Sequence, residues 1–270
     1  MDNVFFIIGC PRSATTAIAE ILQISNNSEI YIEQEPKLCI ESRRLWKDQL
    51  DNPTELLHQH KENIIKSVTD RGLVYGDKNP NYLPFVPYLE QLWNPKFIFV
   101  LRDGRDVVRS LLDWHHVCGG NVFGMIEDDE NSTVELPEED WWDYSRLRPN
   151  CTDKYFNEWK NMGRFEKCAW YWNEFTLQMF SLMASLSQER YRLIHVEKVC
   201  ASDFEEIFNF LNLNHFNAKK IEKKLASRIN AADGRAKVIR AFPQWDSWTD
   251  EYNQQFDRLA RSAMELSGYY

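Results

Sequence analysis

The fold is decided by residues 4–16, which read VFFIIGCPRSATT. The first half is a short, continuous apolar run, which is typical of a parallel strand buried on both faces. A tight polar loop follows, and beyond it apolar residues recur at helical spacing, at Ala17, Ile18, Ile21 and Leu22. A strand, a polar loop and a helix form the unit from which phosphate-binding α/β folds are built.

The same alternation of strand and helix continues along the chain. Apolar runs predict further strands at Ile30–Ile32, Leu73–Tyr75, Lys96–Leu101 and Tyr191–Val196. Helical periodicity predicts helices over 56–68, late in 82–93, around 107–112, over 165–186, over 204–211 and over 256–264. We therefore predict an α/β protein whose parallel β-sheet is flanked by helices on both faces.

The domain organisation follows from length and periodicity. A chain of 270 residues with 43% hydrophobic residues can bury one sizeable core. Residues 117–160 show no sustained period, which is typical of an insertion or lid. We predict a single domain over residues 1–270, in which the segment 117–160 forms an insertion or lid on the side of the domain that receives the acceptor.

Charge and cysteine usage narrow the class of protein. Lys and Arg number 32 and Asp and Glu 41, so the formal net charge is −9, which argues against nucleic-acid and membrane partners. No apolar run reaches the roughly 18–20 residues that span a bilayer, and no signal-peptide pattern precedes the first strand. The six cysteines are scattered without a CxxC pair, which is typical of free thiols. We predict a cytoplasmic protein without a metal site.

The loop after the first strand is suited to an anion. Backbone N–H groups at the N-terminus of a helix bind phosphate or sulfate oxygens. Arg12 adds a cation there, and Ser13, Thr15 and Thr16 add hydroxyl donors. A nucleotide-triphosphate P-loop has Gly-Lys where this chain has Ala14-Thr15, so the loop matches an ATPase poorly.

A second motif follows the strand Lys96–Leu101. Arg102 stands at the carboxyl end of this strand, where open α/β sheets bind ligands. Ser110 lies about two turns along the next helix, on the face that also carries Asp103 and Asp106. An Arg at a strand end and a Ser on the next helix can hold one phosphate from two sides.

Together these motifs resemble those of the sulfotransferases that use 3′-phosphoadenylyl sulfate (PAPS). Residues 9–16, GCPRSATT, resemble the PxSGTT-type loop of that family, and residues 100–112, VLRDGRDVVRSLL, resemble its RDPRDVxxS element. The likeness continues through residues 191–213 and the last helix, whereas 113–160 lie outside it. The resemblance implies a P-loop NTPase-like three-layer sulfotransferase core with PAPS as the donor.

The resemblance also implies roles for individual residues. The 5′-phosphosulfate would be held by the loop residues Arg12, Ser13, Ala14, Thr15 and Thr16, and the 3′-phosphate by Arg102 and Ser110. Two positions depart from the family pattern, with Ala14 in place of Gly and Gly104 in place of Pro. A methyl group at residue 14 restricts the loop but leaves its backbone donors intact.

The catalytic base has more than one candidate. Residues 76–82, GDKNPNY, resemble the EKxPxYF segment of heparan-type sulfotransferases, which implies Asp77 as the base and Lys78 beside the sulfuryl group. Arg12 and Lys78 would steady the charge on the leaving phosphate. Glu35, after the second predicted strand, is a rival base. The weaker alternatives are His58, His60, His115 and His116.

A late loop completes the predicted donor site. Residues 232–237, ADGRAK, resemble the glycine-and-basic loop that closes over the 3′-phosphate in the family. Gly234 would allow close backbone approach and Arg235 would supply charge, although Asp233 stands where a Lys is expected. An exposed turn is the alternative interpretation.

One segment accounts for the whole net charge. Residues 120–145 contain nine Asp or Glu and no Lys or Arg, which leaves 32 acids against 32 bases elsewhere. The acids flank Trp141, Trp142 and Tyr144, whose rings can stack on a planar or cationic group. If this segment lines the acceptor pocket, it repels polyanions and favours a neutral or cationic small-molecule acceptor. A solvated surface loop is the alternative.

Overall fold

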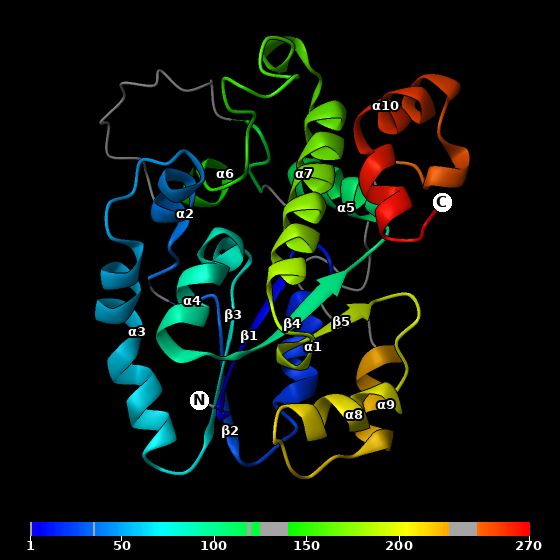
Figure 1. Cartoon of the computed structure of the whole chain (residues 1–270). Coiled ribbons are helices and arrows are strands. Elements are labelled where there is room, and N and C mark those ends of the chain that lie inside the picture. Colours follow the sequence, from blue (N-terminus) through cyan, green and yellow to red (C-terminus); the bar gives the residue numbers. More distant parts are fainter. Residues whose placement is uncertain (1, 35, 118–119, 125–139, 227–241) are drawn as a thin grey trace.

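The computed structural model describes residues 2–34, 36–117, 120–124, 140–226 and 242–270 (Figure 1). The sheet contains each of the five predicted strands, all parallel, in the order β2-β3-β1-β4-β5. Their bounds are β1 Val4–Gly9, β2 Ser28–Ile32, β3 Val74–Lys78, β4 Lys96–Leu101 and β5 Tyr191–His195.

Helices follow each strand along the chain, and the last three of the described α-helices come after β5. The α-helices are α1 Thr15–Leu22, α2 Cys39–Trp46, α3 Pro53–Thr69, α4 Val86–Trp93, α5 Gly104–Val117, α6 Trp141–Tyr144, α7 Arg164–Ser185, α8 Asp203–Phe210, α9 Ala218–Ala226 and α10 Asp250–Leu266. Short 3-10 helices are η1 Pro80–Phe85, η3 Trp159–Asn161, η4 Gln188–Arg190 and η6 Trp245–Ser247. The sequence pattern did not predict α2, α6 and α9.

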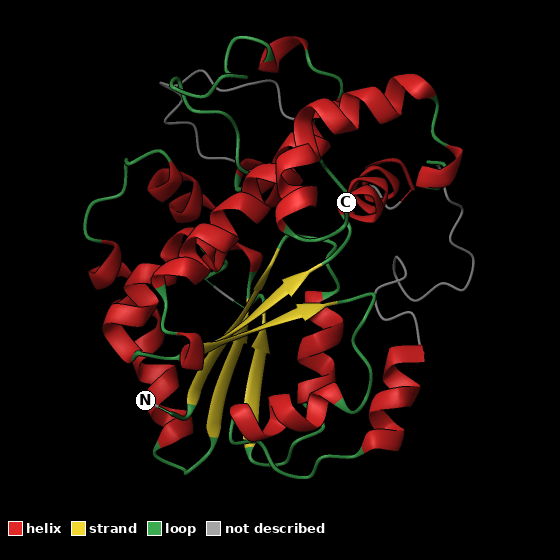
Figure 2. Ribbon diagram, turned by 45° about the vertical axis from the view of Figure 1, so that its right-hand side comes forward, coloured by secondary structure: helices red, strands yellow, loops and turns green. Residues whose placement is uncertain are grey.

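Helices cover both faces of the sheet and give the fold three layers (Figure 2), and a cluster of buried hydrophobic residues lies on each face. Alternate residues of each strand point to opposite faces. On β1, Phe6 packs with α3, α4, α5 and α7, whereas Phe5 and Ile7 pack with α1, α8 and α9. A sheet covered on both faces explains the continuous apolar runs of its strands, and it confirms the predicted α/β class.

The topology places one crevice at the carboxyl ends of the strands. After β1 the chain builds β2 and β3 on one side of it, and it then crosses to build β4 and β5 on the other. Strand order therefore reverses between β1 and β4, which is where open α/β sheets bind ligands. The loops that carry Arg12 and Arg102 leave these two strands.

Strand β3 is longer than predicted, and this changes the surroundings of Asp77. The sequence analysis ended the strand at Tyr75, but pairing continues to Lys78, with Asp77 opposite Phe6 and Lys78 opposite Ile7 on β1. Gly76 fits inside the strand because a Cβ there would lie 2.4 Å from the Phe5 ring. A residue within a strand must point to one face of the sheet, so Asp77 and Lys78 point to opposite faces.

The described part of residues 117–160 contributes to the core. Trp159 is 5% exposed, and its ring centroid lies 5.2 Å from that of Trp170 on α7 and 5.3 Å from that of Phe123. This part of the predicted insertion is therefore packed rather than peripheral.

The single domain over 1–270 stays a prediction. Across the described residues, no helix combines the length and the apolar character needed to cross a bilayer.

Candidate active site

A cavity of about 690 Å³ opens at the carboxyl edge of the sheet, at the predicted crevice. Three groups of residues line it, which come from the loop after β1 with α5, from the ends of β2 and β3, and from the segment after α5. They are Pro11, Arg12, Ala14, Thr15, Thr16, Arg102, Ser110, Leu111 and Trp114; Ile32, Glu33, Lys78, Pro80 and Asn81; and Gly120, Asn121, Asp140, Trp142, Ser145 and Arg146.

The structure brings together Arg12, Arg102 and Ser110, which the sequence analysis assigned to the donor site. Arg12 Nε donates to Ser110 Oγ at 3.1 Å, and Arg102 Nη1 donates to the Arg12 carbonyl at 2.9 Å. The Arg12 guanidinium also lies over the Trp114 ring, 4.9 Å from its centroid. Residues about 90 positions apart in sequence thus form one cationic surface, as their motifs predict.

The loop after β1 has an unusual backbone. Arg12 and Ala14 have φ angles of 73° and 62°, in the left-handed region that costs a non-glycine residue roughly 1–2 kcal/mol. Ala14 is the N-cap of α1, so the first-turn N–H groups that follow have no partner within the helix. Ser13 is buried, and its Oγ has no hydrogen-bond partner. This set of unused donors fits an anionic group with several oxygens.

The departure at Gly104 has a packing reason. A Cβ at residue 104 would lie 2.5 Å from the indole ring of Trp172 on α7. Trp172 Nε1 in turn donates to the Arg102 carbonyl at 3.2 Å. The buried Trp172 therefore takes the space that a Pro ring at residue 104 would need, and it holds the end of β4 in place.

Lys78 lies in the cavity beside a carboxylate that the sequence analysis did not select. Lys78 Nζ forms an ion pair with Glu33, the first residue after β2. Burial lowers the pKa of the Lys78 ammonium, and the negative charge of Glu33 opposes that shift. Glu33 has a φ of 51° and its side chain is 32% exposed, so its carboxylate remains open to the cavity.

Asp77 is not placed in the cavity, which corrects its expected position. Its side chain is 1% exposed, and Oδ2 accepts hydrogen bonds from Lys61 Nζ at 2.9 Å, Tyr75 OH at 2.7 Å and Tyr82 OH at 2.6 Å. Burial raises the pKa of both tyrosines well above the usual value, so they remain neutral donors. The carboxylate is buried among core residues and does not line the cavity.

The remaining candidates fall into two groups. Glu35, Gly234 and Arg235 lie outside the described residues, so their roles stay predictions. None of the histidines contributes to the lining of the cavity. His58 and His60 are exposed on α3, His116 is exposed on α5, and His115 Nδ1 accepts from the Val122 N–H at 3.3 Å.

The segment after α5 forms one wall of the cavity. Its first described residue, Gly120, packs so closely on Trp114 that a Cβ there would lie 1.8 Å from Nε1. Of the nine acids in this segment, Asp140 and Asp143 lie within the described residues. Asp143 is fully buried and pairs with Arg146 at 2.9 Å, so it supports the wall, whereas Asp140 lines the cavity.

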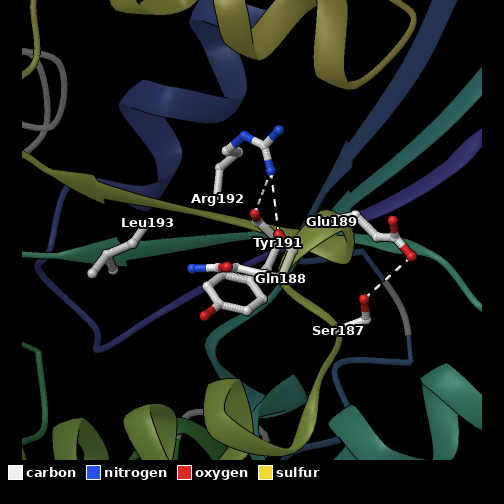
Figure 3. A pocket seen from close by; sticks show the side chains of 6 residues that line it. All are labelled: Ser187, Gln188, Glu189, Tyr191, Arg192 and Leu193. Atoms are coloured by element: carbon white, nitrogen blue, oxygen red, sulfur yellow. Dashed lines mark hydrogen bonds between the residues drawn. The ribbon is translucent and has the colours of Figure 1, made fainter.

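A second hollow lies away from this site, where η4 leads into β5 (Figure 3). Its volume is about 650 Å³, and it is open to solvent. It is lined by Ser187, Gln188, Glu189, Tyr191, Arg192 and Leu193. These residues surround the amino end of β5, the opposite edge of the sheet from the phosphate loop. We assign it no part in the chemistry.

The described chain resembles solved sulfotransferase structures. Mouse sulfotransferase SULT7A1 complexed with PAP matches 98% of this chain and 85% of that chain, with a TM-score of 0.53 and 13% sequence identity. The sulfotransferase domain from the curacin biosynthetic pathway matches 96% of this chain and 98% of that chain, with a TM-score of 0.46 and 13% sequence identity. The sulfotransferase domain from the Synechococcus PCC 7002 olefin synthase matches 96% of this chain and 93% of that chain, with a TM-score of 0.49 and 13% sequence identity.

We base the fold assignment on the mouse enzyme, which has the highest TM-score of the three. The chain has the sulfotransferase fold, an α/β sandwich with a P-loop-like core, as the sequence motifs implied. No protein-family model and no curated protein sequence matches the chain. Within the described residues, no group of three or more His, Cys, Asp or Glu side chains is arranged to hold a metal ion.

Proposed function

We propose that this protein transfers a sulfuryl group from PAPS to a hydroxyl or amine of a small-molecule acceptor. The observation that carries the proposal is the contact of Arg12, Arg102 and Ser110 beside Lys78 in one cavity. Two phosphate-binding motifs that meet at one site suit a nucleotide with phosphates at both the 5′ and 3′ positions. The mouse enzyme of the same fold was solved with PAP, the nucleotide product of such a transfer.

The residues of the cavity fit the two charged ends of PAPS. Arg102 and Ser110 would bind the 3′-phosphate, with Arg12 between the two motifs. The hydroxyls of Thr15 and Thr16 and the first-turn N–H groups of α1 would bind the 5′-phosphosulfate. The buried Ser13 hydroxyl, which lacks a partner, adds a donor beneath the same loop. PAPS supplies a sulfuryl group bonded to a phosphate oxygen.

Lys78 and Arg12 are the cations for the transfer. Donors aimed at the oxygen where charge develops stabilise the transition state, and removal of one such donor costs about 10²–10³-fold in rate. Lys78 Nζ is buried and points to the cavity face of β3, so it needs little reorganisation. The pairing of Arg12 with Ser110 and its stacking on Trp114 fix its guanidinium in the same way.

Glu33 is the best-placed described base. Sulfuryl transfer forms a bond from the acceptor oxygen or nitrogen to sulfur, breaks the bond from sulfur to the phosphate oxygen, and releases the acceptor proton. A carboxylate within hydrogen-bond reach of the acceptor can accept that proton. Glu33 lines the cavity and is oriented by Lys78, whereas Asp77 is enclosed by its three donors. Glu35, two residues further on, stays an alternative.

Calorimetry tests the proposal directly. We expect PAP to bind, ATP to bind at least tenfold more weakly, and Arg102→Met to weaken PAP binding at least tenfold, about 1.4 kcal/mol. The matched control is Arg71→Met, since Arg71 pairs with Glu29 on the surface. Tighter binding of ATP than of PAP would instead favour a nucleotide kinase of the P-loop type.

A transfer assay then separates the remaining alternatives. Incubation with sulfur-labelled PAPS and separate pools of small hydroxyl or amine compounds and of oligosaccharides should label the small compounds. Labelling of the oligosaccharides alone would identify a carbohydrate sulfotransferase. Binding of PAP without transfer to either pool would identify a protein that binds phosphate esters without catalysis.

A further inference from the structure

The wall of the cavity opposite the phosphate loop has its own chemistry. It is formed by Asn121, Asp140, Trp142, Ser145 and Arg146, all from the segment after α5. None of these residues belongs to the motifs that resemble the sulfotransferase family. This wall is therefore where the chain's own acceptor preference is encoded.

Arg146 and Asp140 are the two charged side chains on this wall. Arg146 is 6% exposed, and its Nη1 donates to Asp143 Oδ1 at 2.9 Å and to the Trp142 carbonyl at 2.9 Å. Asp143 lies beneath the wall and also pairs with Arg148, at 3.8 Å. Asp140 Oδ1 accepts from the uncharged amide of Asn121 at 3.1 Å, and no Lys or Arg of the described chain pairs with it. Among the described residues, the cavity wall therefore presents one carboxylate whose hydrogen-bond partner is an uncharged amide.

An indole lines the same wall as this carboxylate. Trp142 lines the same wall two residues along the chain, and it is half-buried. The face of an indole attracts cations, and a carboxylate next to it adds a direct ionic partner. The other wall carries Arg12, Lys78 and Arg102, so a cation there would meet repulsion, whereas at Asp140 it meets attraction.

We infer that the acceptor carries an ammonium or guanidinium group, which binds between the Asp140 carboxylate and the Trp142 indole. The acceptor hydroxyl or amine then points toward Glu33 and Lys78. This inference rests on the proposed function for its nucleophile, but the cation site itself belongs to the wall. With the polyanionic donor bound, a cationic acceptor also relieves the repulsion between donor and Asp140.

Binding of matched probes tests the inference. Tyramine, 4-ethylphenol and 3-(4-hydroxyphenyl)propanoic acid share a phenol and differ in the charge at the other end. Ethanolamine adds an aliphatic ammonium. Dissociation constants should be measured by calorimetry on the protein with and without saturating PAP. We expect tyramine to bind at least tenfold more tightly than the carboxylate probe and at least threefold more tightly than 4-ethylphenol.

Variants connect the preference to the two residues. Asp140→Asn keeps an oxygen for the Asn121 amide but removes the charge, so it should reduce the preference for tyramine over 4-ethylphenol to less than twofold. Trp142→Leu should weaken tyramine binding about threefold to tenfold, and Trp142→Phe should restore part of it. Glu206→Gln, an exposed change on α8, is the control and should leave every constant unchanged.

The outcomes separate this inference from the proposed function. Failure of both ammonium probes to bind, equal binding of the three phenols, or an unchanged preference in Asp140→Asn would overturn the cation site. Failure of PAP to bind, with tyramine still bound in an Asp140-dependent manner, would overturn the proposed function and leave the cation site in place.

Discussion

Two lysine–carboxylate pairs each have one member on β3, at the adjacent residues Asp77 and Lys78, and they differ in their surroundings. Lys61 and Asp77 are both at most 5% exposed, and two tyrosine hydroxyls also donate to Asp77 Oδ2. Lys78 is as buried as Lys61, but its partner Glu33 is 32% exposed and lines the cavity. One pair is enclosed by the core, and the other has a carboxylate that lines the cavity.

This difference comes from the alternation of side chains along a strand. Asp77 and Lys78 are neighbours, yet one points into the layer of α3 and α4 and the other toward the site. The Asp77 carboxylate accepts three hydrogen bonds at Oδ2 in the core and does not line the cavity. Adjacent positions in a motif can therefore point one side chain into the core and the other into a cavity.

The largest expected effect is on the enclosed pair. Removal of one partner from a buried ion pair leaves an uncompensated charge, which costs about 3–5 kcal/mol of unfolding free energy. We expect this loss for Lys61→Met in denaturant titration. Lys66→Met, an exposed change on the same helix, should cost less than about 0.5 kcal/mol. Similar small losses for both variants would show that the two pairs do not differ.

A change in the pair of Lys78 and Glu33, whose carboxylate lines the cavity, should alter the rate of transfer rather than the stability of the fold. Lys78→Met should lower kcat by about 10²–10³-fold, because it removes a donor to the leaving phosphate oxygen. Its melting temperature should change far less than that of Lys61→Met. Steady-state kinetics and thermal denaturation on the same preparations check this prediction. A variant of Lys78 that unfolds while Lys61→Met stays folded would reverse our assignment.

The tyrosine donors provide a finer test of the enclosed pair. Tyr82→Phe removes one hydrogen bond from the buried Asp77 carboxylate, which should cost about 1–3 kcal/mol of stability. Its kcat should stay within about twofold of wild type, because no reacting group contacts Tyr82. A large fall in kcat without a loss of stability would give Asp77 a catalytic role after all.

The pH dependence of kcat is a further test of the pair of Lys78 and Glu33. Burial lowers the pKa of Lys78, so its ammonium is lost as pH rises through a value below the usual lysine pKa of about 10.4. We expect kcat to fall in that range. The unfolded chain, in which the pKa of Lys78 is higher, holds this proton more tightly than the folded protein. Titration of Lys78 therefore makes the folded protein more stable as pH rises between the two pKa values, so unfolding caused by Lys78 cannot explain the fall in kcat. Lys78→Arg, if active, should lack the alkaline fall.

The sequence predicted the fold well because its strands are buried on both faces. Such strands are continuous apolar runs, and each predicted run became a strand. The end of β3 was missed because Gly76-Asp77-Lys78 is polar and resembles a turn. The pairing with β1 and the packing of Gly76 against Phe5, which are long-range contacts, extend the strand instead.

Part of the candidate site was predictable from the two motifs and their resemblance to those of a known family. Arg12, Arg102 and Ser110 belong to motifs with fixed positions relative to a strand and a helix, and the structure brings them together. Glu33 was missed although it directly follows β2, because that strand is short and two glutamates stand near its end. Its position could have identified it, because the first residues after the strands of a parallel sheet lie at the edge where such sheets bind ligands.

The most direct test of the account is the activity of Glu33→Gln measured beside that of Asp77→Asn. We predict that Glu33→Gln lowers kcat at least about 10²-fold while its melting temperature stays within a few degrees of wild type. We predict that Asp77→Asn loses stability instead. An active Glu33→Gln, together with a folded but inactive Asp77→Asn, would contradict the account.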